Sequence, residues 1–208
     1  MTLLALEFSS ERRSAALARD GVILAEAAET GGRATNAFGL IDRALAESKI
    51  PRDEIEAVAV GLGPGSYTGI RAAIAVAQGW QLARGIKLLG IPSVEALAAQ
   101  AQAEKIFGRV NVVVDAQRGE FYLATWEISG AGRREISPLK IVVAAEIERR
   151  QRDGEIFTGP ETGIILFPAA AMLARLASSR NHFAGDDSLE PVYLRTANFI
   201  KASPATIF

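Results

Sequence analysis

The 208-residue sequence contains no cysteine and a single histidine, His182. No disulfide, thiolate metal site or cysteine nucleophile is therefore available. One histidine cannot supply a two-histidine metal site on a helix, and a Ser-His-Asp triad would depend on His182 alone, in a polar segment typical of the surface. No cluster of Asp and Glu suggests carboxylate-bound Mg²⁺ either. We therefore expect no metal and no cofactor.

Excess charge of one sign and long apolar runs are also scarce. The formal net charge is −1, and the basic runs at 12–13, 133–134 and 149–152 are flanked by acidic residues. This pattern favours a solvated surface over a nucleic-acid interface, which needs clustered Lys and Arg. The longest later apolar run, 163–174, is too short to span a bilayer, and no signal peptide is visible. We expect a cytoplasmic protein.

Hydrophobic residues make up 49% of the chain and aromatic residues only 7%, so Ala, Leu, Ile and Val must fill the core. Their periodicity predicts strands at 2–8, 13–19, 22–28, 57–62, 86–91, 110–114, 121–128, 136–143 and 155–158. Helices are predicted at 37–49, 68–84, 94–104, 144–152 and 168–178, with Asn36 and Ser93 as N-caps of the first and third. This order predicts an α/β fold with a first lobe over residues 1–104 and a smaller lobe and tail over 105–208.

The strongest local motif is the glycine-rich segment GLGPGSYTGIR, which begins at Gly61 between a predicted strand and a predicted helix. Such a turn gathers unpaired N–H groups and the positive end of a helix dipole, so Gly63, Gly65, Ser66 and Thr68 are candidates for phosphate binding. The motif is neither a Walker A loop nor G-x-G-x-x-G. A tight strand-to-helix connection capped by Thr68 is the alternative, and both interpretations stay open.

The helix that follows this motif is apolar nearly all round. A helix of this kind should be covered on both sides. Its second cover is either the helix at 37–49 in the same lobe or a partner subunit that meets both helices. The residues expected at such a partner surface are Phe38, Ile41, Leu45, Ala72, Ala75, Val76, Gly79, Trp80 and Ala83.

A second charged motif, DAQRGE, begins at Asp115 and joins two predicted strands. Asp115, Arg118 and Glu120 would place two carboxylates and a guanidinium around one turn. These three residues form either a ligand-facing group or an ordinary charged hairpin turn with an Arg–Asp pair.

Several of these segments resemble the TsaB family of tRNA-modification subunits. The opening LLALEFSSERRSAAL resembles the first motif of the actin-like ATPase superfamily. The segments GLGPGSYTGIRAAIAVAQG, GIPSVEALA and VVDAQRGEFY resemble TsaB, and PVYLR at 191–195 is similar to its C-terminal P-x-Y-x-R. The resemblance covers roughly residues 3–125 and 191–195.

This resemblance implies two ribonuclease-H-like lobes of the actin-like ATPase superfamily. It further implies a non-catalytic subunit that supports threonylcarbamoyladenosine modification of tRNA. Such a subunit pairs through first-lobe helices with the catalytic paralogue TsaD, or with itself when alone. A TsaE-type ATPase belongs to the same complex, and contact with tRNA is at most indirect.

The same resemblance maps Glu7, Ser9 and Ser10 to a vestigial nucleotide motif. Glu7 stands where the family usually has Asp, and Ala34-Thr35-Asn36 replaces a segment in which many relatives carry a histidine. The family is also known under the glycoprotease or peptidase M22 name. The alternative function is therefore an enzyme in its own right, either an M22-like peptidase or a small ATPase.

Overall fold

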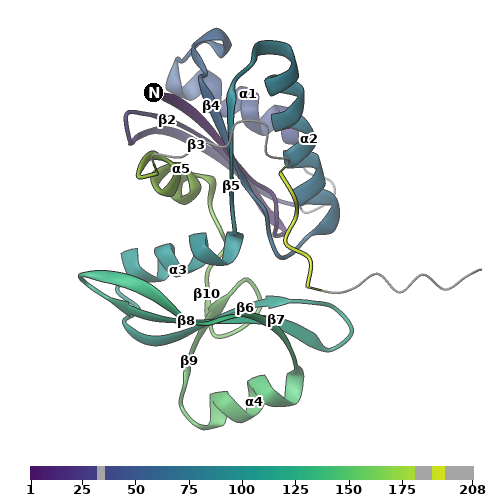
Figure 1. Ribbon diagram of the computed structural model, residues 1–208, viewed down its shortest axis with the longest axis vertical. Helices are drawn as coiled ribbons and strands as arrows, with labels where there is room; N and C mark the ends of the chain where they lie inside the picture. The colour runs from purple at the N-terminus through teal and green to yellow at the C-terminus, as the bar shows by residue number, and fades with distance from the viewer. Residues whose placement is uncertain (32–35, 181–188, 195–208) are drawn as a thin grey trace, which may run out of the picture.

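The computed structural model describes residues 1–31, 36–180 and 189–194. It contains two five-stranded sheets, one above the other in Figure 1, with helices on both faces of the upper sheet. Three residues discussed above, Ala34, Thr35 and His182, lie outside the described residues, as does Arg195 of the C-terminal motif.

The first sheet has the strand order β3-β2-β1-β4-β5. Its strands are β1 (Thr2–Glu7), β2 (Arg12–Arg19), β3 (Val22–Thr30), β4 (Ala57–Gly61) and β5 (Lys87–Ile91). β1, β2 and β3 pair antiparallel, whereas β4 and β5 run parallel to β1. The carboxyl ends of β1, β3, β4 and β5 therefore meet at one edge of the sheet.

The second sheet repeats this topology, with the order β10-β9-β6-β7-β8. Its strands are β6 (Gly108–Asp115), β7 (Glu120–Ser129), β8 (Gly132–Val143), β9 (Ile156–Gly159) and β10 (Ile164–Ile165). β6, β7 and β8 pair antiparallel, β9 and β10 are parallel to β6, and helix α4 (Ala144–Arg152) connects β8 to β9. The prediction of two ribonuclease-H-like lobes is confirmed.

Helices α1 (Ala37–Ser48) and α2 (Tyr67–Arg84) cover the same face of the first sheet, where their buried residues share one core with β1, β2 and β4. A short 3₁₀ turn, η2 (Arg52–Glu54), precedes β4. Asn36 caps α1 as predicted, because its side chain accepts a hydrogen bond from the N–H of Gly39. Ser66, not Thr68, caps α2.

Two helices each follow a strand of one lobe and pack on the sheet of the other. α3 (Ser93–Ala103) follows β5 of the first lobe but packs on β6, β7, β8 and β9 of the second. α5 (Ala170–Ser178) follows β10 of the second lobe but packs on β1 to β5 of the first. The two helices also touch each other, and Figure 1 shows them between the sheets. The predicted boundary at residue 104 places α5 in the second lobe, although α5 packs on the sheet of the first lobe.

The start of α5 is fixed to the first sheet by polar contacts. The N–H of Ala170 donates to Oγ of Ser14 at 2.8 Å, and the N–H of Ala171 donates to Oε1 of Glu26 at 2.9 Å. Side chains of β2 and β3 thus take the place of a cap within α5, which has no side-chain cap of its own.

Leu173→Ala tests the packing of α5 on the first sheet. Leu173 is fully buried among residues of β1 and β4, so its truncation should lower the free energy of unfolding by about 2–5 kcal/mol. Chemical denaturation monitored by circular dichroism measures this loss. The control Leu82→Ala removes an exposed leucine, and its effect should stay within about 0.5 kcal/mol. Equal effects of the two variants would contradict the packing.

Within the described ranges, no helix is both long and apolar enough to cross a lipid bilayer.

Candidate functional site

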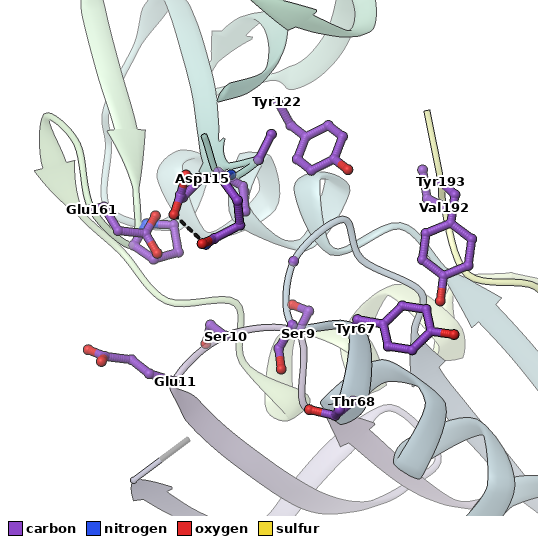
Figure 2. Close-up of a pocket in the computed structure, with 16 residues that line it drawn as sticks. Ser9, Ser10, Glu11, Tyr67, Thr68, Asp115, Tyr122, Glu161, Val192 and Tyr193 are labelled. Atoms are coloured by element: carbon purple, nitrogen blue, oxygen red, sulfur yellow. Dashed lines mark hydrogen bonds between the residues drawn. The ribbon is translucent and has the colours of Figure 1, made fainter. Parts of the chain in front are cut away.

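A cleft of about 540 Å³ lies between the two lobes. The turn after β1, the start of α2, the β6–β7 turn, the residues after β9 and the C-terminal segment 189–194 all contribute to it (Figure 2). Of the residues predicted for a vestigial nucleotide motif, the cleft is lined by Ser9, Ser10, Gly65, Ser66 and Thr68. The structure thus brings together residues nearly sixty positions apart in the sequence on one side of the cleft.

Glu7 lies beneath the cleft and is fully buried. Its Oε1 accepts a hydrogen bond of 2.8 Å from the N–H of Ser9, and its Oε2 accepts one of 2.8 Å from Oγ of Ser93. Burial raises the pKa of Glu7, and the hydrogen bonds from Ser9 and Ser93 only partly offset this effect. Both carboxylate oxygens are therefore used within the protein.

The contact between Glu7 and Ser93 explains two features of the sequence. Ser93 was predicted to cap α3, but its hydroxyl donates to Glu7 while the N–H of Gly63 donates to it, and α3 has no side-chain cap. A Cβ at Gly61 would lie 2.0 Å from Oε2 of Glu7, so only glycine fits where β4 passes this carboxylate. The glycine-rich segment that begins at Gly61 thus passes close to the Glu7 carboxylate.

Backbone N–H groups at the start of α2 also form hydrogen bonds within the protein. The N–H of Ser66 donates to the carbonyl of Ser9 at 2.6 Å, and the N–H of Gly69 donates to Oγ of Ser66 at 3.3 Å. Gly65, with φ +146°, has the Ser9 carbonyl 2.1 Å from where a Cβ would stand. A phosphate at this helix start would have to compete with the Ser9 carbonyl for these donors. The interpretation of the motif as a tight connection therefore fits the observed bonds better.

The remaining charged residues in the cleft are acidic. Glu11, Asp115 and Glu161 line it, and no Lys or Arg belongs to the described lining. Burial raises the pKa of Glu161, and the nearby carboxylates of Asp115 and Glu11 raise it further. The cleft is thus a region of negative potential, which repels phosphate groups.

Three tyrosines line the cleft on the side away from the carboxylates: Tyr67, Tyr122 and Tyr193 (Figure 2). The rings of Tyr67 and Tyr193 stack with centroids 5.6 Å apart. Tyr193 is held there because the N–H of Val192 donates to the carbonyl of Leu62 at 2.9 Å and Leu189 is buried in the core of the first lobe. The C-terminal segment therefore forms part of the cleft wall, beside α2 in Figure 1.

The β6–β7 turn brings only part of its predicted group to the cleft. Asp115 lines it, but its carboxylate accepts bonds of 2.7 Å and 2.6 Å from the backbone and side chain of Gln117, in place of the Arg–Asp pair expected for a hairpin. Arg118 is exposed with φ +62°, and neither Arg118 nor Glu120 is among the described lining residues.

Sequence reasoning missed Glu11, Tyr122, Glu161 and Tyr193 as cleft residues. Tyr122 and Tyr193 lie inside segments that resemble TsaB, yet nothing in the pattern relates them to the first lobe. Glu161 follows β9, the strand that corresponds to β4 in the repeated topology. An alignment of the two lobes would have pointed to Glu161. It follows the fourth strand of the second sheet, as the glycine-rich segment with Gly65 follows the fourth strand of the first.

No group of three or more His, Cys, Asp or Glu within residues 1–31, 36–180 and 189–194 is arranged to hold a metal ion. Asp115 and Glu161 lie near each other in the cleft, but the third carboxylate, Glu11, lies apart from them (Figure 2). The described residues therefore offer no ready-made metal site.

The second feature of interest is the outer face of α2, formed by Arg71, Ala75, Gly79, Leu82 and Ala83. All five residues are exposed, and Leu82 is 91% exposed. The opposite side of the helix, with Ile70, Ala73, Ile74 and Ala77, packs on the sheet. α1, one of the two covers considered for this helix, does not cover the outer face. The described chain leaves this face of α2 uncovered.

The predicted partner surface needs correction at two positions. Ile41 and Leu45 are 2% and 7% exposed and belong to the core of the first lobe. They pack under α1 and do not face outward. Ala72, Val76 and Trp80 are half-buried at the side of α2. Phe38, Ala75, Gly79 and Ala83 are exposed, and Leu82 was missed. A helix with Ala and Gly on all sides gives no clear signal of which side faces the sheet.

The topology, the cleft and the buried acidic residue define the class as a two-lobed α/β protein of the actin-like type. Residues 18–172, more than half of the chain, match the family described as TsaD, tRNA N6-adenosine threonylcarbamoyltransferase. The tRNA threonylcarbamoyladenosine biosynthesis protein TsaB of Escherichia coli is 29% identical over 94% of this chain and 95% of its own length. TsaB of Haemophilus influenzae is 38% identical over 60% of this chain and 53% of its own length.

Among solved structures, YeaZ from Pseudomonas aeruginosa superposes with a TM-score of 0.76 at 27% identity, over 93% of this chain and 99% of that one. The chain belongs to the TsaB family, as the resemblance of its motifs predicted.

Proposed function

We propose that this chain takes part in the biosynthesis of threonylcarbamoyladenosine in tRNA as a non-catalytic subunit that binds a TsaD-type transferase. The names of its relatives support the pathway. The observation that carries the finer proposal is the outer face of α2, which leaves Leu82 91% exposed next to Ala75, Gly79 and Ala83.

A partner on this face is energetically reasonable. If it covers roughly 600 Å² of apolar surface, the gross gain is on the order of 15 kcal/mol. Association costs an estimated 4–15 kcal/mol, so a stable pair requires good packing of the small residues. Ala75, Gly79 and Ala83 allow another helix to approach α2 closely, and Phe38 on α1, 64% exposed, is a second apolar residue that a partner could cover.

The internal hydrogen bonds on the first-lobe side of the cleft support a non-catalytic role. Glu7 is fully bonded within the protein, the start of α2 is bonded to Ser9, and three carboxylates replace the basic residues that a nucleotide would need. We therefore assign the nucleotide and the chemistry to the TsaD-type partner. A TsaE-type ATPase completes the complex, contact with tRNA is at most indirect, and the complex works in the cytoplasm. Without the partner, the same face pairs two copies of this chain.

Co-purification with the TsaD-type paralogue tests the proposal, together with assays of the pair and of each chain alone. We expect a stable pair that supports tRNA modification, and no hydrolysis of ATP or peptide by this chain by itself. Hydrolysis by the isolated chain, lost together with a cleft residue such as Ser10, would favour the alternative of a small ATPase or M22-like peptidase.

A further inference from the structure

The cleft between the lobes has a composition that none of the features above explains. It holds about 540 Å³, enough for a small organic molecule, and two of its walls differ in chemistry. In Figure 2, Glu11, Asp115 and Glu161 lie on one side, and Tyr67, Tyr122 and Tyr193 lie on the other.

The carboxylate side selects for positive charge. Of these carboxylates, Asp115 is bonded to Gln117, whereas Glu161 points toward Asp115 and has no cation within the described lining. Burial is the largest cause of the raised pKa of Glu161, and the carboxylates of Asp115 and Glu11 add to it, although backbone hydrogen bonds at Asp115 and Glu161 lower it in part. A cation placed between the two carboxylates would relieve their repulsion.

The tyrosine side selects for an organic cation over a metal ion. Aromatic faces attract ammonium and guanidinium groups and pack against their methylene stems. The molecule already contains such a contact at the edge of this wall: the Arg71 guanidinium lies 5.3 Å from the centre of the Tyr67 ring and donates to its hydroxyl at 3.2 Å. The described carboxylates do not form a metal-binding group, so an inorganic divalent ion fits the cleft less well.

We propose that the cleft between the lobes binds an alkylammonium or alkylguanidinium group, with its charge near Asp115 and Glu161 and its stem against Tyr122 and Tyr193. The group comes either from a free small amine or from a Lys or Arg side chain of another protein. This inference does not depend on the association with a TsaD-type partner, because the cleft lining includes none of the exposed apolar residues of the outer face of α2, which it adjoins only at Arg71.

Titration of the full-length chain with agmatine, which carries a guanidinium and an ammonium group, tests this site by isothermal calorimetry or NMR at constant ionic strength. The peptide acetyl-Gly-Arg-Gly-amide serves as the second probe and the ATP analogue AMP-PNP as the anionic one. We expect agmatine or the peptide to bind and AMP-PNP not to bind. Stronger binding of agmatine indicates a free amine, and binding of the peptide at least as strong indicates a protein side chain.

The double variant Asp115→Asn/Glu161→Gln should weaken binding about tenfold or more, which corresponds to at least about 1.4 kcal/mol. The control Asp53→Asn/Glu148→Gln removes two exposed carboxylates outside the cleft and should bind as the parent does. Three results overturn the proposal: neither cation binds at about ten millimolar, both double variants bind equally well, or AMP-PNP binds more tightly than the cations.

Discussion

Gly79→Arg is expected to weaken association with a TsaD-type partner at least about a hundredfold, or about 2.7 kcal/mol, and to leave the isolated chain folded. Gly79 lies in the middle of the outer face of α2, where a Cβ would meet no heavy atom within 4 Å. The arginine therefore fits in the free chain, but a docked helix would have to bury its charge or move away.

The same substitution should not destabilise the monomer. A glycine inside a helix costs about 0.8–1 kcal/mol relative to alanine, and arginine is also a good helix former. The thermal midpoint should therefore stay the same or rise slightly. Calorimetric titration with the partner measures the affinity, and circular dichroism measures the melting curve.

Gly132→Arg is the matched control. Gly132 lies in β8 of the second lobe, and a Cβ there also meets nothing within 4 Å. This variant introduces the same charge and volume away from α2, so its affinity for the partner should equal that of the parent. Equal affinities of the Gly79→Arg and Gly132→Arg variants for the partner would show that the outer face of α2 is not part of the interface.

Glu7→Gln is expected to stabilise the protein by roughly 1–3 kcal/mol at pH 8 and to have little effect below pH 4.5. Glutamine preserves the shape, can still accept from the N–H of Ser9 and can donate to Oγ of Ser93. It removes a buried carboxylate that has no basic partner among the described residues.

The pH dependence of this difference has a defined sign. Burial raises the pKa of Glu7 in the folded chain above its ordinary value of 4.5. The folded state therefore holds this proton more tightly than the unfolded state, and stability falls as pH rises from 4.5 through the raised pKa. The stability advantage of the Glu7→Gln variant over the parent should grow over the same interval and then level off.

Denaturant unfolding of the parent and of Glu7→Gln at pH 4.5 and pH 8 measures this difference. Glu148→Gln, at an exposed position on α4, should change stability by no more than about 0.5 kcal/mol at either pH. A loss of stability in Glu7→Gln that increases with pH would mean that Glu7 is held as an anion, as a metal-binding role would require.

Local sequence signals predicted most of the elements. The alternation of apolar residues indicated the strands of both sheets, and Asn36 marked the start of α1 because its side chain can satisfy the N–H of Gly39. The positions of α3 and α5 could not be predicted in the same way. An apolar stripe shows that a helix is buried, but Leu173 and its neighbours would fit either sheet equally well.

The cleft was predictable only on its first-lobe side, where Ser9, Ser10 and Gly65 belong to recognisable motifs. Its acidic and aromatic walls come from the second lobe and from the C-terminal segment, and only the packing of the lobes brings Glu161 and Tyr193 to it. Ser93 illustrates the same limit at a single residue. Its position suggests a helix cap, whereas the buried Glu7, 86 positions earlier, takes its hydrogen bond.

Reconstitution of tRNA modification with a TsaD-type paralogue, in the presence of Glu7→Gln or Gly79→Arg in parallel, separates the two surfaces most directly. If the chain works through the outer face of α2 and not through chemistry in its own cleft, Glu7→Gln supports threonylcarbamoyladenosine formation at the parental rate and Gly79→Arg does not. The opposite result, full activity with Gly79→Arg and none with Glu7→Gln, would contradict a role through the outer face of α2.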